Sequence, residues 1–404
     1  MFDDLRMNHI DITGKIGSEL PDRRILGIQP PMSRSATPES AYVTPGMPPL
    51  DTAGSPVSYF EFWPIWLIYA PVAIQWLLLG AYYRSFSLPL IANPNIPSAG
   101  MVGFSKADFL AQAEPNSQKW ILPWVTHQVS SEGLPEQIDQ VMSAMADKGL
   151  SLPIVAKPDM GCRGIGIKLI NTEAEMHDYV CHYPVGSTLM LQRLADWEPE
   201  AGIFYVRQPN QDKGRVISMA LKYTPYVVGD GVSTLRELLN ADPRAGQVMH
   251  LYESRHHAKM DDVIADGEPF RLVFAASHCR GAVFRDGRHY ITDALSEKIE
   301  EVMSGFPEFY YGRLDIKFHS IERLMQGEDF AIIEVNGASS ESLHIWDKKA
   351  GLGEAWSALL GQYYTLFKIG NMNRQRGHQP PGIMSLIKAW RHEQSLSNHY
   401  PATD

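Results

Sequence analysis

The chain has 404 residues, of which 44% are hydrophobic and 20% are charged, and its net charge is −10. This length is enough for two or three domains and a large buried core. The acidic balance argues against a nucleic-acid binder, whose footprint would be basic, so we expect no nucleic-acid partner; an anionic small substrate needs only a local positive site.

Cysteine usage and the first residues indicate a reducing, cytoplasmic compartment. Cys162, Cys181 and Cys279 are odd in number and far apart, which favours neither a disulfide framework nor a cysteine zinc site. The first twenty residues lack the basic-then-apolar pattern of a signal peptide. Residues 1–55 are rich in proline, and we expect a disordered tail or a loosely docked arm.

Residues 62–83 form an uncharged apolar segment of the length that can span a bilayer. Glu61 and Arg84 flank it, and aromatic residues gather at both of its ends, as at membrane interfaces. Pro71 and Gln75 weigh against a span, because a proline and a buried amide both cost free energy inside a helix. A buried or interfacial helix and a single membrane span both stay open.

Helices and strands mix along the rest of the chain, which predicts an α+β fold. The expected helices are 105–113, 134–149, 233–241, 294–306 and 351–368. The expected strands are 87–96 (with a turn), 152–158, 187–194, 201–208, 215–224, 311–318 and 330–337, with a hairpin over 282–292 across Asp286 and Gly287. Residues after 370 show little pattern.

A glycine-rich loop, "AKPDMGCRGIGIK" at 156–168, lies between two predicted strands. Its glycines, Gly161, Gly164 and Gly166, fit neither a Walker loop nor a dinucleotide loop, because no Lys-Ser/Thr follows and the glycine spacing is reversed. A loop between two strands can fold over phosphates as a flap, and Lys157 and Arg163 would add positive charge. A plain hairpin with glycines at positive φ is the alternative reading of the loop alone.

Three hard oxygen ligands lie on the last two predicted strands. "GRLDIKF" carries Asp315, and "FAIIEVNG" carries Glu334 and Asn336 two residues apart, hence on one face of a strand. Carboxylate and amide oxygens suit Mg²⁺, which prefers a few carboxylates together with phosphate oxygens. Carboxylates beside so apolar a run would be costly unless they were paired or bound to metal. Solvated acids at a sheet edge are the alternative.

Four motifs in order resemble the ATP-grasp superfamily, which includes D-alanine–D-alanine ligase, glutathione synthetase and cyanophycin synthetase. They are the flap, "LMLQRLADWEPEAGIFYVR", "MALKYTPYVVGDGVSTLRELL" and "GRLDIKF…FAIIEVNGASSE". The resemblance covers about residues 100–345. It implies an α+β fold of two lobes clasping ATP between them, here with a reduced and atypical N-terminal region. It also implies ATP and Mg²⁺ as cofactors, with Mn²⁺ as an alternative metal.

The resemblance implies a role for each matching residue. The phosphates would be held by Lys157, Lys222 and the flap residues Gly161, Cys162, Arg163 and Gly164. The adenine edge would be read at Gln192, Arg193 and Leu194, and the ribose by Glu200, with Glu198 as its rival. Mg²⁺ would be held by Asp315, Glu334 and Asn336. Arg313 would stabilise the transferring phosphoryl group, with Lys222 beside it and Arg280 as a candidate clamp for the substrate carboxylate.

The chain departs from the family in two places. "GASSESLHIWD" follows Asn336 where D-alanine ligases carry a proline-glycine-methionine segment, so Ser339, Ser340 and Glu341 are expected to touch a different acceptor. The usual N-terminal βα domain is mostly replaced by the apolar segment, which indicates an unusual acid, apolar or membrane-borne. His256 and His257 are adjacent and are expected at the surface rather than at a metal. Cys162 is not expected to act as a nucleophile.

The favoured function is an ADP-forming ligase that joins a small carboxylic acid to an amine through an acyl phosphate. An ATP-grasp kinase and a non-catalytic membrane-associated scaffold are the alternatives. The expected organisation is a tail (1–55), an N-terminal region (56–130), two lobes (131–225 and 226–370) and a C-terminal tail (371–404). The oligomeric state stays open, with a homodimer as one option, as does contact of 62–83 with a membrane surface.

Overall fold

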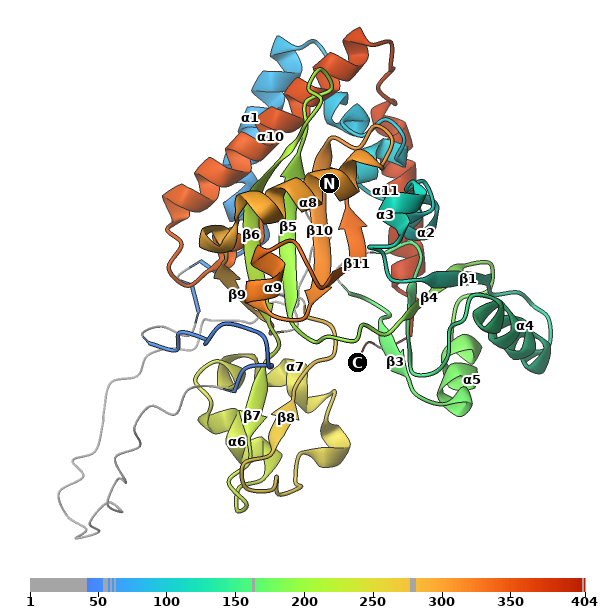
Figure 1. Cartoon of the computed structure of the whole chain (residues 1–404), viewed down its shortest axis with the longest axis vertical. Coiled ribbons are helices and arrows are strands. Elements are labelled where there is room, and N and C mark those ends of the chain that lie inside the picture. The colour runs from blue at the N-terminus through green and yellow to red at the C-terminus, as the bar shows by residue number, and fades with distance from the viewer. Residues whose placement is uncertain are drawn as a thin grey trace, which may run out of the picture.

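The computed structural model describes residues 42–53, 57–58, 60–61, 63–161, 164–276, 281–401 and 403. Helices and antiparallel strands are mixed along the chain, which confirms the predicted α+β fold. Figure 1 shows a large central sheet, a smaller sheet beside it, a small module below and a layer of helices above.

The smaller sheet has the strand order β1-β4-β2-β3, and all its pairs are antiparallel. Its strands are β1 (Trp124–Gln128), β2 (Ile154–Pro158), β3 (Lys168–Ile170) and β4 (Thr188–Arg193). The helices α4 (Leu134–Asp147) and α5 (Glu173–Cys181) pack their apolar sides into a core with these strands. In α4 the buried residues include Ile138, Val141 and Met145, at the predicted helical spacing.

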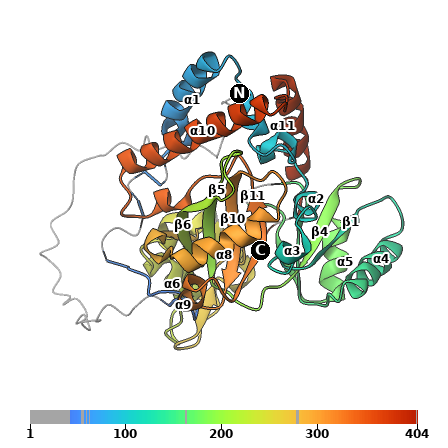
Figure 2. The ribbon, with the colours of Figure 1, turned by 45° about the horizontal axis from the view of Figure 1, so that its top comes forward.

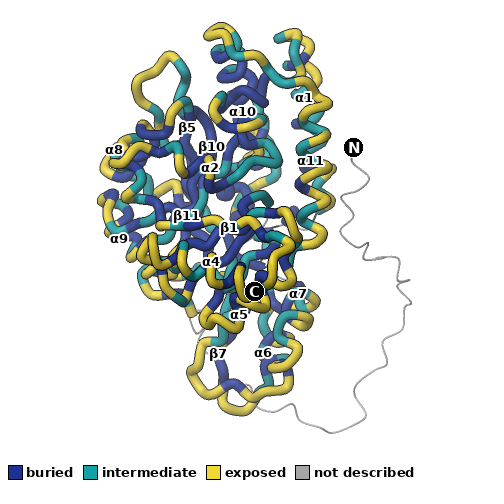
Figure 3. The backbone as a smooth tube through the Cα atoms, turned by 90° about the vertical axis from the view of Figure 1, so that its right-hand side faces the viewer, coloured by how far each residue is buried: buried dark blue, intermediate teal, exposed yellow. Residues whose placement is uncertain are grey.

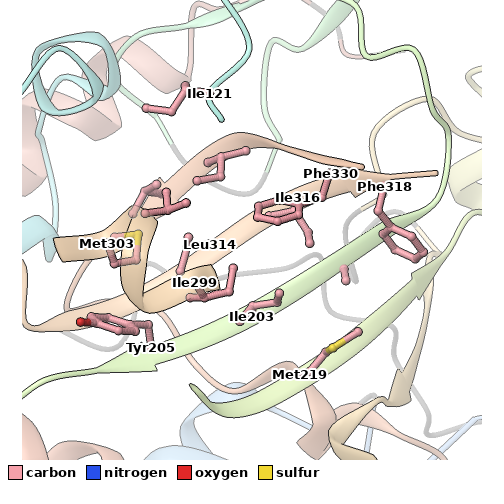
Figure 4. Close-up of a cluster of buried hydrophobic side chains, with 14 of the residues drawn as sticks. Ile121, Ile203, Tyr205, Met219, Ile299, Met303, Leu314, Ile316, Phe318 and Phe330 are labelled. Carbon is pink, nitrogen blue, oxygen red and sulfur yellow. The ribbon is translucent and has the colours of Figure 1, made fainter. Parts of the chain in front are cut away.

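The large sheet has the order β11-β10-β5-β6-β9. Its strands are β5 (Glu200–Val206), β6 (Arg215–Tyr223), β9 (Val283–Asp286), β10 (Tyr311–Phe318) and β11 (Phe330–Asn336). One face packs on α8 (Asp293–Ser304) through residues such as Ile203, Leu314 and Met303 (Figure 4). Because side chains alternate along a strand, Arg313 and Asp315 project from the opposite face, where Gly202 presents bare backbone.

A helical layer covers part of that opposite face (Figure 2). It contains α1 (Ile65–Tyr82), α10 (Leu352–Gln375) and α11 (Ile383–Ser397). Leu366 and Ile369 of α10 pack with Phe204 of β5, and Ile68 and Val72 of α1 share a core with Leu359. Figure 3 shows buried backbone in the interior and alternating exposed and half-buried positions along α1 and α11.

A small module follows β6. It contains β7 (Tyr226–Val228), β8 (Pro269–Arg271), α6 (Leu235–Ala241) and α7 (Met249–Glu253). The strands β7 and β8 pair with each other, and the module has its own apolar core. The capping box predicted at the start of α6 is present: Thr234 accepts from the backbone of Glu237, whose side chain accepts from Thr234 in return.

The helices α2 (Lys106–Leu110), α8 and α10 and six of the predicted single strands are confirmed, but three local predictions are wrong. Residues 87–96 form short 3-10 turns, because Pro89 and Pro94 cannot donate to a strand ladder and Leu88–Ile91 is buried as a block. The hairpin at 282–292 stops after β9, where Asp286 binds Arg288 and starts a turn. The residues after 370 complete α10 and form α11.

The N-terminal prediction is partly corrected. Residues 42–53 are ordered: Met47 belongs to the main core, and Gly46 accepts a backbone hydrogen bond from Ile321 at 3.0 Å. Most of the predicted tail lies outside the described residues. The apolar segment is helical from Ile65 to Tyr82, with one side packed inside the protein. The domain boundaries stay a prediction.

Candidate active site

The two sheets meet at a buried lysine. Lys157, on β2, donates to the side chain of Gln192 at 2.8 Å and to the backbone carbonyl of Ile333 on β11 at 2.9 Å. Its ammonium group is therefore held at the junction where the small sheet faces the large one. Burial lowers the pKa of Lys157 to about 8, although Glu334 acts to raise it.

The three predicted metal ligands come together on neighbouring strands. In the antiparallel β10–β11 pair, Asp315 lies opposite Glu334, and Arg313 lies opposite Asn336. Residues directly opposite each other in such a pair project from the same face. The sequence order Arg-x-Asp on one strand and Glu-x-Asn on the next thus gathers four polar side chains on the face turned toward Lys157.

Asp315 is the centre of a saturated charge cluster. It accepts from Arg313 Nε at 2.9 Å and Nη2 at 3.1 Å, pairs with Lys222 at 2.9 Å and accepts from Asn336 at 3.2 Å. Burial alone would raise its pKa, but Arg313 and Lys222 hold the pKa of Asp315 at about 2. The absence of a side chain at Gly202 leaves space for this cluster, because a Cβ there would lie 3.2 Å from Arg313 Cδ and 3.3 Å from Asp315 Oδ1.

Glu200 extends this cluster along the sheet. Its two carboxylate oxygens pair with Lys222 and Lys317, each at 2.8 Å. Burial acts to raise its pKa, yet the two ammonium groups lower the pKa of Glu200 on balance. The rival Glu198 is exposed and contacts Tyr226 at 3.2 Å. We call Glu200, Lys222, Arg313 and Asp315 the β10 network.

Glu334 has a different environment. Its side chain is 27% exposed, and its ion pair with Lys106 is long, at 3.9 Å. Lys106 also donates to the backbone carbonyl of Gly161 at 2.6 Å and to that of Asp159 at 3.3 Å. Lys106 therefore joins Glu334 to the glycine-rich loop. We call Lys106, Lys157, Glu334 and the loop the loop corner.

Lys106, Lys317 and Gly202 were missed from the sequence. One signal could have found Lys106: it is the first residue of α2, directly after the N-cap Ser105, whose hydroxyl accepts from Asp108 N. A cation is unfavourable at a helix N-terminus, so a buried lysine there needs an anion or carbonyl partner from elsewhere. Lys317 and Gly202 become visible only once the register of β5 and β10 is known.

The glycine-rich loop joins two paired strands, as the flap interpretation requires. β2 and β3 are antiparallel neighbours, and Gly164 and Gly166 have φ of +72° and +74°, a region that favours glycine. The C-terminal segment covers this loop: Tyr400 donates to Met160 at 2.8 Å, and Thr403 donates to Gly164 at 3.0 Å. The predicted contacts Cys162 and Arg163 lie outside the described residues.

The predicted adenine-reading segment lies at the end of β4. Gln192 is buried, and its amide group connects Lys157 with the carbonyl of Leu122. Arg193 is exposed and pairs with Asp196, so its side chain is not brought into the polar site. Leu194 is half-buried. The role of this segment in reading adenine stays a prediction.

The segment after β11 borders the site through Glu341. Its carboxylate accepts from Tyr69 of α1 and, at 2.8 Å, from Trp346, while its backbone carbonyl accepts from Arg313 at 3.3 Å. Ser339 and Ser340 instead donate to backbone carbonyls of Gly100 and Gly337. Of the three residues predicted to touch the acceptor substrate, Glu341 is the one that contacts the β10 network, through its backbone carbonyl.

Two further predictions have different outcomes. Arg280 lies outside the described residues, so its role as a carboxylate clamp stays a prediction. His256 is half-buried rather than fully at the surface, and its Nε2 bonds the carbonyl of Leu272 at 2.8 Å. Its neighbour His257 is exposed.

The three predicted metal ligands suit a magnesium ion only if a phosphate compound completes its coordination. Within the described ranges, no three His, Cys, Asp or Glu side chains form a metal-binding group. Asp315, Glu334 and Asn336 offer two carboxylates and an amide oxygen, and Mg²⁺ commonly completes its shell with phosphate oxygens and water. Glu334 is the more exposed of the two carboxylates, whereas Asp315 would have to exchange a bond to Arg313, Lys222 or Asn336 for the metal. The residues therefore fit Mg²⁺ when a phosphate compound arrives with it to take up the released donors.

No family model and no curated protein matches the chain. It is similar to the solved structure of a bifunctional glutathione synthetase from Pasteurella multocida, with 13% identity, a TM-score of 0.31 and coverage of 67% of this chain and 38% of that one. It is also similar to the D-alanine-D-alanine ligase from Coxiella burnetii, with 8% identity, a TM-score of 0.36 and coverage of 73% and 62%.

The chain thus spans less than two thirds of either protein. Glutathione synthetase and D-alanine–D-alanine ligase are two of the enzymes named above as members of the ATP-grasp superfamily. With TM-scores below 0.5, the likeness locates no site residue and no substrate on this chain.

Proposed function

We propose that the chain is an ATP-dependent ligase of the ATP-grasp type that joins a carboxylic acid to an amine. One observation carries the proposal: at the junction of two sheets, Lys106, Lys157, Lys222 and Arg313 face Asp315 and Glu334 beside a glycine-rich loop. Lys222 and Arg313 are already compensated by Asp315. Lys106 and Lys157 instead contact mainly carbonyl and amide oxygens, and buried cations without a close anion are costly. A nucleotide triphosphate with a divalent cation supplies the matching charges.

Lys157 and Lys106 would hold phosphate oxygens of ATP. Both ammonium groups now donate to carbonyl or amide oxygens, which phosphate oxygens can replace as stronger, charged acceptors. The loop at 159–166 would close over the phosphates with its backbone N–H groups. Glu200, or its exposed rival Glu198, would bind the ribose, and the backbone near Gln192 would read the adenine.

Asp315, Glu334 and Asn336 would hold Mg²⁺ between themselves and the phosphates. The metal supplies charge neutralisation at the phosphoryl group when it is bound. Asp315 is already ionised at neutral pH because its pKa is held at about 2, so no proton has to leave it before binding. Glu334 has the more accessible carboxylate of the two, with 27% of its side chain exposed against 6% for Asp315.

The reaction proceeds in two displacements. A carboxylate oxygen of the acid attacks the γ-phosphorus of ATP. The bond between the γ-phosphorus and the oxygen that bridges it to the β-phosphate breaks, and ADP and an acyl phosphate result. The amine nitrogen then attacks the acyl carbon, the carbon–oxygen bond to phosphate breaks, and the amine loses a proton. Arg313 and Lys222 would neutralise the charge that develops on phosphoryl and tetrahedral oxygens, which is the main task in such transfers.

The substrates are small carboxylic acids and amines, and the compartment is the cytoplasm. Glu341 is the strongest candidate to recognise an acceptor, because its carboxylate is fixed by Tyr69 and Trp346 next to Arg313. A fixed carboxylate attracts an ammonium group before the amine loses its proton.

The test combines nucleotide binding with product analysis. Mg-ATP should raise the melting temperature of the protein, because a ligand that binds only the folded state stabilises it. The protein is then incubated with Mg-ATP and pools of acids and amines. It should release ADP and free phosphate in equal amounts only when both an acid and an amine are present. The variant control is Arg323→Ala, which removes an exposed, ion-paired cation away from the polar site and should behave like the unaltered protein.

Two results would contradict the proposal. If Mg-ATP leaves the melting temperature unchanged at saturating concentration, the nucleotide site does not exist. If phosphate appears covalently on a single substrate rather than in solution, the chain is a kinase and not a ligase.

A further inference from the structure

The helix α1 has two apolar sides, and only one of them is covered. Ile68, Val72 and Gly80 are buried inside the protein. On the other side, Trp66, Ile74, Leu77, Leu78 and Tyr82 are between 58% and 78% exposed. The helix contains no charged residue. An uninterrupted apolar stripe of this kind on a protein surface marks an interaction site.

Positive charges predominate around this stripe: Glu354 of α10 and Glu393 of α11 are the acidic residues of these helices, and Arg376 pairs with Glu308. Residues 62–105 and 355–392, which include α1, most of α10 and the first part of α11, contain six lysines and arginines and no aspartate or glutamate. The whole chain, in contrast, has a net charge of −10. Arg84, Lys388 and Arg391 are exposed. The helical layer is therefore a basic, apolar surface on an acidic protein.

The helix α11 extends this surface. Ile383 and Met384 at its start are 50% and 64% exposed, and Figures 2 and 3 place α1 and α11 on the same side of the molecule. The layer is anchored at both ends: Arg374 of α10 donates to the carbonyl of Tyr83 at 3.0 Å, and Glu393 of α11 accepts from Gly103 N at 2.6 Å.

We infer that the exposed side of α1, together with α11, docks on the surface of an anionic lipid bilayer, with α1 lying in the plane of the interface. Apolar side chains would enter the boundary between headgroups and acyl chains, and the basic residues would meet anionic headgroups. Trp66 and Tyr82, near the two ends of the stripe, are residue types that favour this boundary.

Two observations favour this occupant over the alternatives. A membrane span would require α1 to leave the protein, yet Gln75 donates to the carbonyl of Leu360 at 3.0 Å and Trp356 donates to the carbonyl of Ile68 at 3.1 Å. A second copy of the chain would bring two basic layers face to face, which is electrostatically unfavourable. An anionic bilayer instead complements both the apolar stripe and its charge.

The docked surface would adjoin the polar site. Tyr69 lies on the covered side of α1 and donates to Glu341, next to Arg313. An α-helix is about 10 Å across, so the bilayer surface and Glu341 would be separated by one helix width. Docking itself does not depend on the proposed ligase activity.

The experiment is vesicle flotation of the full chain. One set of vesicles contains phosphatidylcholine alone, and the other contains phosphatidylcholine mixed with phosphatidylglycerol. The unaltered protein should float with the anionic vesicles and bind the neutral ones more weakly. Leu77→Ser/Leu78→Ser should lower binding to anionic vesicles by at least about tenfold, from lost apolar burial. Lys388→Gln/Arg391→Gln should lower it by about fivefold for each charge removed.

The matched control is Val232→Ser/Val263→Ser, which removes two exposed apolar side chains of the small module and should leave flotation unchanged. Each variant is first checked for its melting temperature with and without Mg-ATP, so failure to fold and failure of the nucleotide site are detected separately. Alkaline carbonate should release the bound protein.

Three results would overturn the inference. Flotation could be absent for the unaltered protein, or equal for all variants. Resistance to carbonate would indicate a membrane span. A dimer in solution that Leu77→Ser/Leu78→Ser dissociates, without any vesicle binding, would make the stripe an interface between copies of the chain.

Discussion

In the β10 network, Asp315 lies 2.9 Å from both Lys222 and the guanidinium of Arg313. In the loop corner, by contrast, Glu334 and Lys106 stand 3.9 Å apart, and the glutamate is 27% exposed. Both regions carry the charges needed for a metal and phosphates. In the first, those charges neutralise one another within the protein. In the second, they remain loosely paired and accessible.

The difference indicates which region is preorganised before a ligand binds. A buried, fully paired network keeps its geometry without a ligand, because any displacement would leave a charge unpaired. A loose corner beside a glycine-rich loop can rearrange at little cost. We therefore expect changes in the β10 network to affect both the fold and the activity, and changes in the loop corner to affect the activity alone.

The largest effect is expected for Asp315→Ala. Removing this carboxylate leaves Lys222 and Arg313 buried without their partner, which should cost about 3–5 kcal/mol of unfolding free energy and abolish ATP turnover. Denaturant unfolding measures the first effect. The double variant Asp315→Ala/Lys222→Met should recover part of the lost stability. Equal stability of Asp315→Ala and the unaltered protein would mean that the network is not a unit.

Glu334→Gln should separate the two regions. Its ion pair is long and partly exposed, so the unfolding free energy should change by less than about 1 kcal/mol. Turnover of ATP should fall by about 10²–10³-fold, because a charge that positions metal and phosphate is lost. Steady-state phosphate release and the melting temperature are the two measurements. Undiminished turnover would rule out the metal assignment.

The lowered pKa of Lys157 predicts a pH dependence. Its ordinary pKa of 10.5 falls to about 8 in the folded chain, so the ammonium loses its proton above pH 8 in the folded protein but keeps it in the unfolded one. The kcat/KM for ATP should therefore decline by about tenfold for each pH unit above 8. Over the same interval, the contribution of this group to the unfolding free energy should rise.

Lys157→Met provides the control for that titration. This variant binds ATP weakly but should lack the decline above pH 8. A decline of the same size in the variant would assign the titration to another group.

The smallest effect is expected at Arg193. This residue lies in the predicted adenine-reading segment, but its side chain is exposed and paired with Asp196. Arg193→Ala should change the unfolding free energy by less than about 0.5 kcal/mol and the KM for ATP by less than about threefold. A larger rise in KM would show that the side chain, and not only the backbone, contacts the nucleotide.

The sequence was informative where local spacing decides the outcome. The pair Glu334 and Asn336 had to share one face of a strand, and they do. The register that brings Asp315 opposite Glu334 is a finding of the structure. The helices with clear periodicity or capping, such as α4 and α6, also formed as predicted. These features depend on residues that are close together in the chain.

The sequence was less informative where distant segments meet. Lys106 joins Glu334 to the glycine-rich loop from more than 50 residues away, and no local pattern encodes that contact. Glu200 was expected to face ribose, but its register opposite Lys222 and Lys317 gives it two lysine partners. The helix α11 is not apparent in the sequence, because Glu393 is its buried residue and its apolar residues do not form the stripe of a core-facing helix.

The cover over the glycine-rich loop has a consequence for how that loop acquires its order. Glycine loses more backbone entropy on folding than any other residue, so a loop with three of them is costly to fix by its own contacts. Here Tyr400 and Thr403, about 240 residues later in the chain, supply hydrogen bonds to Met160, Gly164 and Gly166. Substitutions at these two positions should therefore loosen the glycine-rich loop without changing any residue of the proposed nucleotide site.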